Sequence, residues 1–413
     1  MKILMIMHFV PYPPQSGALQ RNYNLLREIA ASHEVHLITL TQKALLSTKE
    51  SLSNAVKNVS PFCKTVKVFD IPSDSHPLLW YFLLFRNIFQ KIPYSTRRFF
   101  SREMQKEIES ILKTVPFDLI HVDTIDLAGY VSGTTTIPTV LNHHNIESEL
   151  LFRRAAHAGN PLAKGYLGFQ ARKLKRYEQR MIPQFNMNVA VSSKDLEGIN
   201  VMAAGGTTAL VPNGTDTIFF SPQAALQSQS LIFAGGLNWL PNADAMVHFC
   251  KAIFPLIAAE APEVRMKIIG ANPPSELQKL SQKNTGIEIL GFVPDIRVYM
   301  ADAAVYVVPL RIGGGTRLKI LDALAMGKAV VSTTIGAEGL ALQDGVDILI
   351  GDTDEAFAQK VVGLLKNPVM RKSIGNAGRL TVEQKYSWKV IAPMLFDVYR
   401  KACKKQETSF TTF

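Results

Sequence analysis

The sequence has few cysteines and no long apolar run, and both absences narrow the class of protein. Three cysteines, Cys63, Cys250 and Cys403, occur in 413 residues without any CxxC spacing. A disulfide framework and a zinc site are therefore not indicated, and free thiols in a reducing compartment are expected. No segment reaches the roughly 18 to 20 apolar residues that span a bilayer. The opening MKILMIMHFVPYPP lacks a small-residue cleavage site, so it is expected to form a first β-strand and not a signal peptide. A cytoplasmic protein is therefore expected.

Two kinds of ligand signature are also missing. No GxGxxG follows any apolar run, which disfavours a dinucleotide-dependent enzyme, and no other cofactor is predicted. His144 and Glu147 have a spacing that could suggest a metal site. Because no third ligand accompanies them, no metal is predicted.

Acidic residues are outnumbered by basic ones, and the excess lies in the first half. The net charge is +11; residues 1–215 hold 24 Lys and Arg against 16 Asp and Glu, and the rest hold 21 against 18. Two basic stretches, 77–100 and 172–180, mix apolar and cationic residues. Such mixing favours an anionic membrane surface, although helices packed in the core with solvated ends would look the same. Nucleic acid is not predicted because no binding motif accompanies the charge.

The composition is globular, with 47% hydrophobic and 19% charged residues, and the length favours two domains. Short β-branched runs alternate with helical stretches along the chain. They lie at 2–7, 34–40, 117–122, 139–144, 188–192 and 208–214, and again at 231–236, 264–270, 287–290, 303–309, 329–334 and 348–351. Such alternation predicts an α/β protein with two doubly wound, Rossmann-like parallel sheets. We expect domains at 1–215 and 216–386, with a helix over 387–404 that packs back on the first.

Ligands of open parallel sheets bind at the carboxyl ends of the strands, so two facing domains would form a cleft lined by strand-to-helix loops. The loop after the first strand ends in Gly17, which can lead a helix toward a phosphate. Asp123 follows the strand 117–122, His144 ends TVLNHH, and Asn145 and Glu147 come after it. Each residue alone could be a cap or a surface group, but together they indicate a site.

The segment GGGTRLKILDALAMGK places two cations behind three glycines, at the start of an apolar helix. With a helix beginning near Thr316, Leu318 and Leu321 share one side, whereas Lys319 and Asp322 belong to a separate stripe. Unpaired N–H groups and the helix dipole favour an anion at such a helix start. An anionic ligand is therefore expected there.

These segments resemble the family-four retaining nucleotide-sugar glycosyltransferases of the GT-B fold. The resemblance rests on PYPPQSGALQRNYNLLREIA, HHNIESELLFRRA, AVSSKD, VPNGTDTIFF, LIFAGGLNWLPNADA and the long run GFVPDIRVYMADAAVYVVPLRIGGGTRLKILDALAMGKAVVST. GGGTRLK and IGAEGL are similar to the branch of bacterial exopolysaccharide and exosortase-associated sugar transferases. The resemblance implies an acceptor-side first domain and a donor-binding second domain.

The chain departs from the family at two places. The family commonly has two glutamates eight positions apart, where this chain has Gly314 and Asp322. It also commonly has an Arg and a Lys after the first strand of the second domain, where this chain has Gly236 and Pro241. Since a diphosphate in a partly desolvated cleft needs cations, we expect Arg317 and Lys319 to supply them.

The resemblance implies further roles at matching positions. Asp322 would bind the ribose hydroxyls, although a surface pair with Lys319 is the alternative. Phe292 and Val293 would lie against the base. The sugar and acceptor side would come from Asp123, Asn145 and Glu147. The expected catalytic residues are Arg317, Lys319 and His144, and the remaining donor-binding residues are Gly17, Gly235, Gly236, Gly313, Gly314, Gly315 and Thr316.

The sequence thus predicts transfer of a sugar from a nucleotide diphosphate sugar to an acceptor hydroxyl, with retention and without a metal. A lipid-linked glycan or exopolysaccharide precursor is the expected acceptor, with the protein peripheral on the inner face of the cell membrane. A GT-B-like nucleotide-sugar epimerase and an inactive nucleotide-sugar sensor remain as alternatives.

Overall fold

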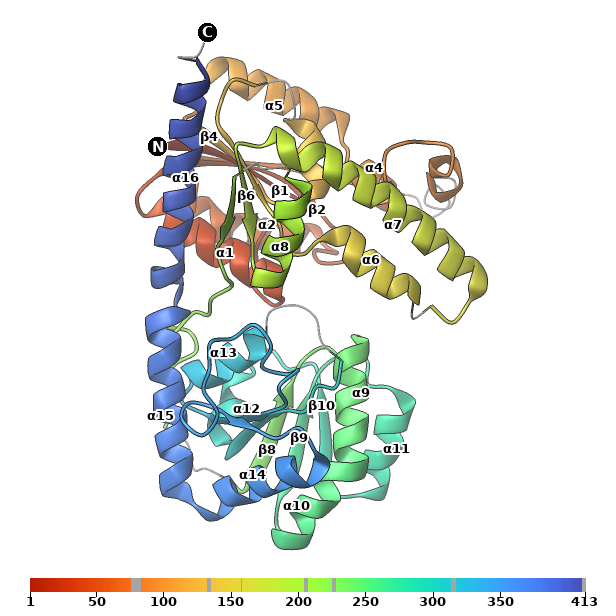
Figure 1. The fold of residues 1–413 in the computed structure, drawn as a ribbon, viewed down its shortest axis with the longest axis vertical. Helices are drawn as coiled ribbons and strands as arrows, with labels where there is room; N and C mark the ends of the chain where they lie inside the picture. Colours follow the sequence, from red (N-terminus) through yellow and green to blue (C-terminus); the bar gives the residue numbers. More distant parts are fainter. Residues whose placement is uncertain are drawn as a thin grey trace. The chain divides into compact units, whose positions relative to one another are not determined.

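The computed structural model divides into two units, which are described separately (Figure 1). Unit 1 comprises Met1–Pro212 and Ala392–Phe413, and unit 2 comprises Asn213–Ile391. The structure describes residues 1–75, 83–131, 135–156, 158–203, 207–224, 228–312 and 317–410. The expected donor-binding residues Gly313–Gly315 and Thr316, and part of the basic stretch 77–100, lie outside these ranges.

Unit 1 is built on a seven-stranded parallel sheet in the order β3-β2-β1-β4-β5-β6-β7. The strands are β1 (Lys2–Met7), β2 (Glu34–Thr41), β3 (Thr65–Asp70), β4 (Leu119–Val122), β5 (Thr139–Asn142), β6 (Met187–Ala190) and β7 (Thr208–Leu210). Its central strands β1, β4, β5 and β6 are apolar runs buried almost throughout, as expected for a parallel sheet that helices cover on both faces. The strand order reverses between β1 and β4, the place where such sheets bind ligands.

The helices of unit 1 connect these strands and cover the sheet. They are α1 (Gly17–Ala30), α2 (Lys49–Val59), α4 (Tyr94–Arg98), α5 (Arg102–Thr114), α6 (Glu147–Ala156), α7 (Pro161–Met181) and α8 (Ser193–Met202), with a 3₁₀ segment at Ile125–Tyr130. Figure 1 shows α6 and α7 packed side by side. The basic stretch 172–180 lies on α7, where Lys173 is buried while Arg172 and Arg176 are exposed.

Helix α16 (Trp388–Phe410) begins in unit 2 and continues in unit 1. Its residue Tyr399 is buried, with its hydroxyl 2.9 Å from Nδ1 of His121 on β4. Phe396 packs against the ring of His33, which lies just before β2. These contacts attach the second part of α16 to the seven-stranded sheet of unit 1.

Unit 2 repeats the architecture with a six-stranded parallel sheet in the order β10-β9-β8-β11-β12-β13. The strands are β8 (Ser230–Ala234), β9 (Arg265–Ile269), β10 (Ile287–Gly291), β11 (Val305–Val308), β12 (Ala329–Ser332) and β13 (Leu349–Ile350). The helices are α9 (Leu240–His248), α10 (Phe254–Glu260), α11 (Ser275–Lys283), α12 (Arg297–Asp302), α13 (Leu318–Ala325), α14 (Asp354–Lys366) and α15 (Pro368–Lys385), with a π-helical turn at Phe249–Ile253. The strand order reverses between β8 and β11.

The structure confirms the expected α/β class with two doubly wound parallel sheets, and it differs from expectation in two details. Strand β3 was not among the expected runs. It lies at the edge of its sheet, and its residues are half-buried or exposed because one side of the strand has no neighbour. The polar positions expected on α13 are also less exposed than their charges suggest, since Asp322 is buried and Lys319 is half-buried. Among the described helices, none is long and apolar enough to cross a membrane.

Candidate functional site

A buried carboxylate marks the point in unit 1 where the strand order reverses. Asp123 directly follows β4 and is 0% exposed. His8 follows β1 and His144 lies two residues after β5, so the loops of three neighbouring strands meet at this carboxylate. His8 Nδ1 lies 3.1 Å from Asp123 Oδ2, and His144 Nε2 lies 3.0 Å from Oδ1.

Two amides complete the surroundings of Asp123. Asn22 of α1 donates from Nδ2 at 2.6 Å, and Asn142, the last residue of β5, donates at 3.2 Å. Burial alone would raise the pKa of Asp123, but the charge and hydrogen bonds of His144 and His8 hold it below its ordinary value. The carboxylate is therefore ionised and fixes both imidazoles in place.

The sequence-based interpretation missed His8, Asn22 and Asn142. His8 lies at the end of the first strand, which is the same kind of signal that singled out Asp123 and His144. Its ring also packs against Phe9 and Phe99, and both imidazoles retain partly exposed surface. A group bound at this edge can therefore reach two imidazoles on one carboxylate.

The remaining residues expected in unit 1 lie on two helix starts. Glu147 begins α6, where burial, followed by the charge of Asp126, raises its pKa to about 7, and Asn145 gives it a side-chain hydrogen bond. Gly17 begins α1, is exposed, and is preceded by Ser16, whose side chain makes no cap hydrogen bond. Within the described ranges, no cluster of three or more His, Cys, Asp or Glu side chains is arranged to hold a metal ion.

In unit 2, Lys319 lies at the corresponding reversal point of the sheet. Its Nζ donates to Oδ1 of Asn242 at 2.7 Å and lies 4.3 Å from the ring centroid of Phe233 on β8. Asn242, on α9, is held in turn because its Nδ2 donates to the carbonyl of Gly236 at 2.9 Å. The amine is thus placed beside the Gly235–Gly236 turn that follows β8.

The turn after β8 leaves just enough room for this amine. A Cβ atom on Gly235 would lie 2.7 Å from Nζ of Lys319 and 3.0 Å from Nδ2 of Asn242. Burial, followed by the positive charge of Arg317, lowers the pKa of Lys319 to about 7. A nearby anion would reverse this effect, so the position is suited to a negatively charged ligand.

Arg317 and Asp322 lie deeper than the sequence suggested. Arg317 is 5% exposed and donates from Nη2 to the carbonyl of Ile335 at 3.1 Å. Burial lowers its pKa, while the charge of Glu338 opposes that shift. Asp322 is 6% exposed and accepts a hydrogen bond from the Thr215 hydroxyl at 2.6 Å. Both side chains therefore help to hold unit 2 together.

The two residues expected near the nucleotide base follow β10. Phe292 is 65% exposed, whereas the neighbouring Val293 is buried in the apolar core of unit 2. Gly291 before them has a positive φ of 68°, a conformation that favours glycine. The turn therefore directs one of the two side chains to solvent and the other inward.

Two family models match this chain, the first mostly in unit 1 and the second within unit 2. Residues 16–219 match the model described as Glycosyltransferase Family 4, and residues 228–367 match Glycosyl transferases group 1. The two matches cover Asp123 and His144 in the first case and Lys319 and Asp322 in the second.

Curated relatives are distant in sequence. The chain is 24% identical over 178 residues to an uncharacterized 44.6 kDa protein in the cps region of Klebsiella pneumoniae, covering 41% of this chain and 46% of that protein. It is 24% identical to the alpha-maltose-1-phosphate synthase of Mycobacterium tuberculosis, covering 67% and 76%. It is 26% identical to the phosphatidyl-myo-inositol mannosyltransferase of that organism, covering 48% and 55%. The chain thus spans about half the length of the first and third of these relatives.

Solved structures share the fold over nearly the whole chain. Sucrose-phosphate synthase from Thermosynechococcus elongatus has a TM-score of 0.68 at 16% identity, covering 97% of this chain and 99% of that one. HepE from Anabaena, solved with UDP, has a TM-score of 0.65 at 14% identity, covering 96% and 99%. With a glycosyltransferase domain matched in each unit, the chain belongs to the glycosyltransferases of the GT-B fold.

Proposed function

We propose that the chain transfers a sugar from a nucleotide diphosphate sugar to an acceptor hydroxyl, with retention at the anomeric carbon. The observation that carries the proposal is the position of Lys319 beside Asn242 and the turn at Gly235. A partly buried amine with a lowered pKa is suited to a ligand that brings negative charge. The diphosphate of the donor meets that requirement.

The proposal assigns donor binding to unit 2. Support comes from the match of this unit to Glycosyl transferases group 1 and from HepE of Anabaena, which is solved with UDP and with UDP-glucose. Lys319 would contact the diphosphate, with Gly235, Gly236 and Gly313–Gly315 allowing close approach of the backbone. Phe292 would lie against the base, since its side chain is exposed after β10.

The chemistry needs little proton transfer from the protein. In a retaining transfer, the departing diphosphate can itself accept the proton of the acceptor hydroxyl on the same face. The protein then supplies orientation and stabilises the negative charge that develops on the leaving group. Lys319, with Arg317 behind it, would provide that stabilisation, and we propose that no metal or other cofactor is needed.

The proposal assigns the transferred sugar and the acceptor to unit 1. Asp123 orders His8 and His144, which keep partly exposed imidazoles able to bond sugar hydroxyls. Glu147 and Asn145 lie beside this cluster on the loop that leads into α6. Because Asp322 has an interior partner in Thr215, a ribose contact from its carboxylate would have to share that bond.

For the acceptor, we propose a lipid-linked glycan or exopolysaccharide precursor, presented at the cytoplasmic face of the cell membrane. Two relatives support this class by their names: one lies in a cps region, and the other is a phosphatidyl-myo-inositol mannosyltransferase. The excess of positive charge in residues 1–215 is consistent with an anionic surface.

A donor screen tests the proposal. Purified protein is incubated with a panel of nucleotide diphosphate sugars and membrane lipid extract, and release of free nucleoside diphosphate is measured with analysis of the sugar product. Transfer to a second molecule supports the proposal. Conversion of the donor alone would identify an epimerase, and tight nucleotide binding without turnover for any donor would identify a sensor.

A further inference from the structure

Residues 85–92 of unit 1 expose a group of large apolar side chains. Phe85 is 64% exposed, Phe89 78%, Ile88 40% and Ile92 43%. The rings of Phe85 and Phe89 contact each other edge to face at 5.8 Å. The helical part of this segment ends at Asn87, and Ile88, Phe89 and Ile92 follow it in a turn and a bend, so the apolar group is defined by exposure and by the contact of the two rings. Exposed apolar patches of this kind mark sites of interaction.

A buried polar network holds this segment in place. Asn87 is 1% exposed, and its Nδ2 donates to the carbonyl of Ile92 at 2.9 Å. Its Oδ1 accepts from Gln170 and from Lys173 of α7, both at 2.9 Å, and Lys173 also donates to the Asn87 carbonyl at 2.6 Å. These hydrogen bonds anchor the segment to α7 through Asn87, while the side chains of Phe85 and Phe89 remain exposed.

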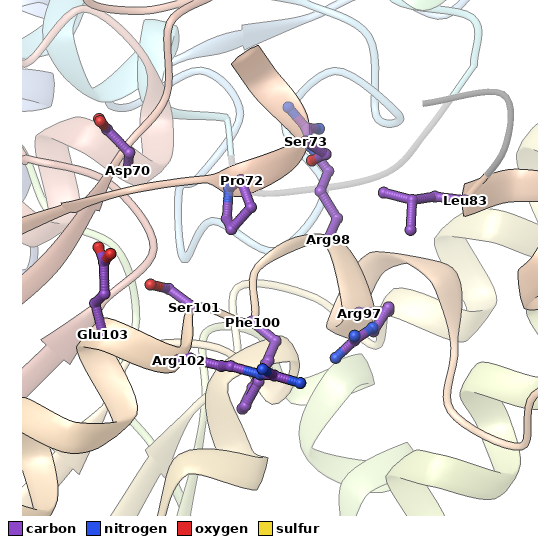
Figure 2. A pocket seen from close by; sticks show the side chains of 10 residues that line it. All are labelled: Asp70, Pro72, Ser73, Leu83, Arg97, Arg98, Phe100, Ser101, Arg102 and Glu103. Carbon is purple, nitrogen blue, oxygen red and sulfur yellow. The ribbon is translucent and has the colours of Figure 1, made fainter. Parts of the chain in front are cut away.

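A hollow of about 530 Å³ lies next to this segment (Figure 2). Its lining residues are Asp70, Pro72, Ser73, Leu83, Arg97, Arg98, Phe100, Ser101, Arg102 and Glu103. Figure 2 shows the two carboxylates at one end and the three guanidinium groups away from them. The volume is within the range of about 300–1,000 Å³ typical of small-molecule sites.

The arginines of the hollow do different work. Arg98 pairs with Asp74 at 3.1 Å, which ties it to the wall. Arg97 lies 5.4 Å from the ring centroid of Phe100, and its side chain lines the hollow. Arg102 is exposed at the start of α5, where the helix dipole adds positive potential. Arg97 and Arg102 are thus the two cations that the hollow can offer to a ligand.

We propose that this face of unit 1 docks on an anionic membrane, with residues 85–92 entering the lipid surface and the hollow binding the phosphate of a lipid headgroup. The exposed aromatic and aliphatic side chains of residues 85–92 match a lipid surface in polarity, and Arg97 and Arg102 in the lining of the hollow match it in charge. This docking would bring the chain to a lipid-linked acceptor, and only in that respect does it rest on the proposed function.

Vesicle co-sedimentation of the full chain tests this docking. We expect binding to vesicles of phosphatidylcholine with phosphatidylglycerol, weakening with salt, and none to phosphatidylcholine alone. Arg97→Gln with Arg102→Gln should weaken binding at least about tenfold, since each cation near an anionic surface is worth about 1 kcal/mol. Phe85→Ser with Phe89→Ser should weaken it similarly by removing the apolar contact.

A matched control separates the hollow from general charge. Lys49→Gln with Lys57→Gln removes the same charge from exposed positions of α2, and we expect vesicle binding to stay within about threefold. An equal loss of vesicle binding in both double variants would overturn the role of the hollow. Titration with inorganic pyrophosphate is the second test. If the wild type binds pyrophosphate through Arg97 and Arg102 but binds no vesicles, the phosphate that the hollow binds does not come from a lipid. Neither test uses a nucleotide sugar, so failure here would leave glycosyl transfer standing.

Discussion

At the residue scale, Lys319 lies beside the turn where we propose that the donor diphosphate binds. Its amine reaches the turn after β8 from α13, one strand away in the sheet, because Asn242 and the ring of Phe233 hold it there. The resemblance to the family alone led to the expectation that Arg317 and Lys319 supply the cations absent at Gly236 and Pro241. The route of the side chain, and the role of Asn242, required the structure.

We predict that Lys319→Ala lowers kcat/KM for the donor by about two decades, or roughly 2.7 kcal/mol of transition-state stabilisation. The cause is loss of the cation at the leaving diphosphate. Steady-state release of nucleoside diphosphate measures the effect, with Lys279→Ala on the exposed side of α11 as the control. A loss below threefold in a folded variant would remove Lys319 from the donor site.

We also predict that binding of a nucleoside diphosphate takes up a proton at pH 8 to 9. The pKa of Lys319 is lowered to about 7, so its amine is largely neutral in that range, and a bound diphosphate would raise the pKa and recharge it. Calorimetry in buffers of different ionisation enthalpy measures the uptake, which should approach one proton. Lys319→Met should abolish it; the same uptake in that variant would contradict the assignment.

For Asp123, we predict a stability effect that depends on pH. Its pKa is held below the ordinary value, so its contribution to stability is present above that value and is lost as pH falls below it. Asp123→Asn should therefore destabilise the chain more at pH 6 than at pH 3. Urea unfolding at the two pH values measures the difference, and an equal loss at both would show that the ionised form is not stabilised.

At the scale of elements, the sequence predicts most of the strands. It does not predict which strand lies at a sheet edge or which side chains meet across the fold. Runs such as 2–7, after its first residue Lys2, and 303–309 are apolar, which identifies central parallel strands directly. Edge strand β3 has half-buried residues, so its pattern resembles that of a loop. The sequence also cannot show that Asp322 faces Thr215, since that contact joins residues far apart along the chain.

The turn after β8 leads to a prediction about close packing. Gly235→Ala should raise the KM for the donor several-fold, because the new methyl group would occupy the space of the Lys319 amine. We expect little change in melting temperature, since the end of a lysine side chain can move away. Gly363→Ala in α14 is the control, because no atom lies within 4 Å of its added Cβ; it should leave KM unchanged and add up to about 1 kcal/mol of stability. Equal KM values for the two variants would contradict the assignment.

At the scale of the whole molecule, the proposed reaction requires groups from both units at one substrate. Lys319 belongs to unit 2 and His144 to unit 1, so donor binding should draw the units together. We predict a smaller radius of gyration in X-ray scattering when a saturating nucleotide diphosphate sugar is added. Lys319→Ala at the same ligand concentration should show a smaller change. Superimposable wild-type profiles would contradict closure.

The path of α16 also determines when unit 1 can complete its fold during synthesis. The surface of β4 near His121 is covered by Tyr399, yet the 179 residues of unit 2 (Asn213–Ile391) are made in between. At roughly 5–20 residues per second, the sheet of unit 1 waits about 10 to 35 seconds for its last helix. Unit 2 can therefore finish folding on the ribosome before unit 1 does, although unit 1 begins first. Until α16 is made, the part of β4 that Tyr399 contacts stays without this partner on the nascent chain.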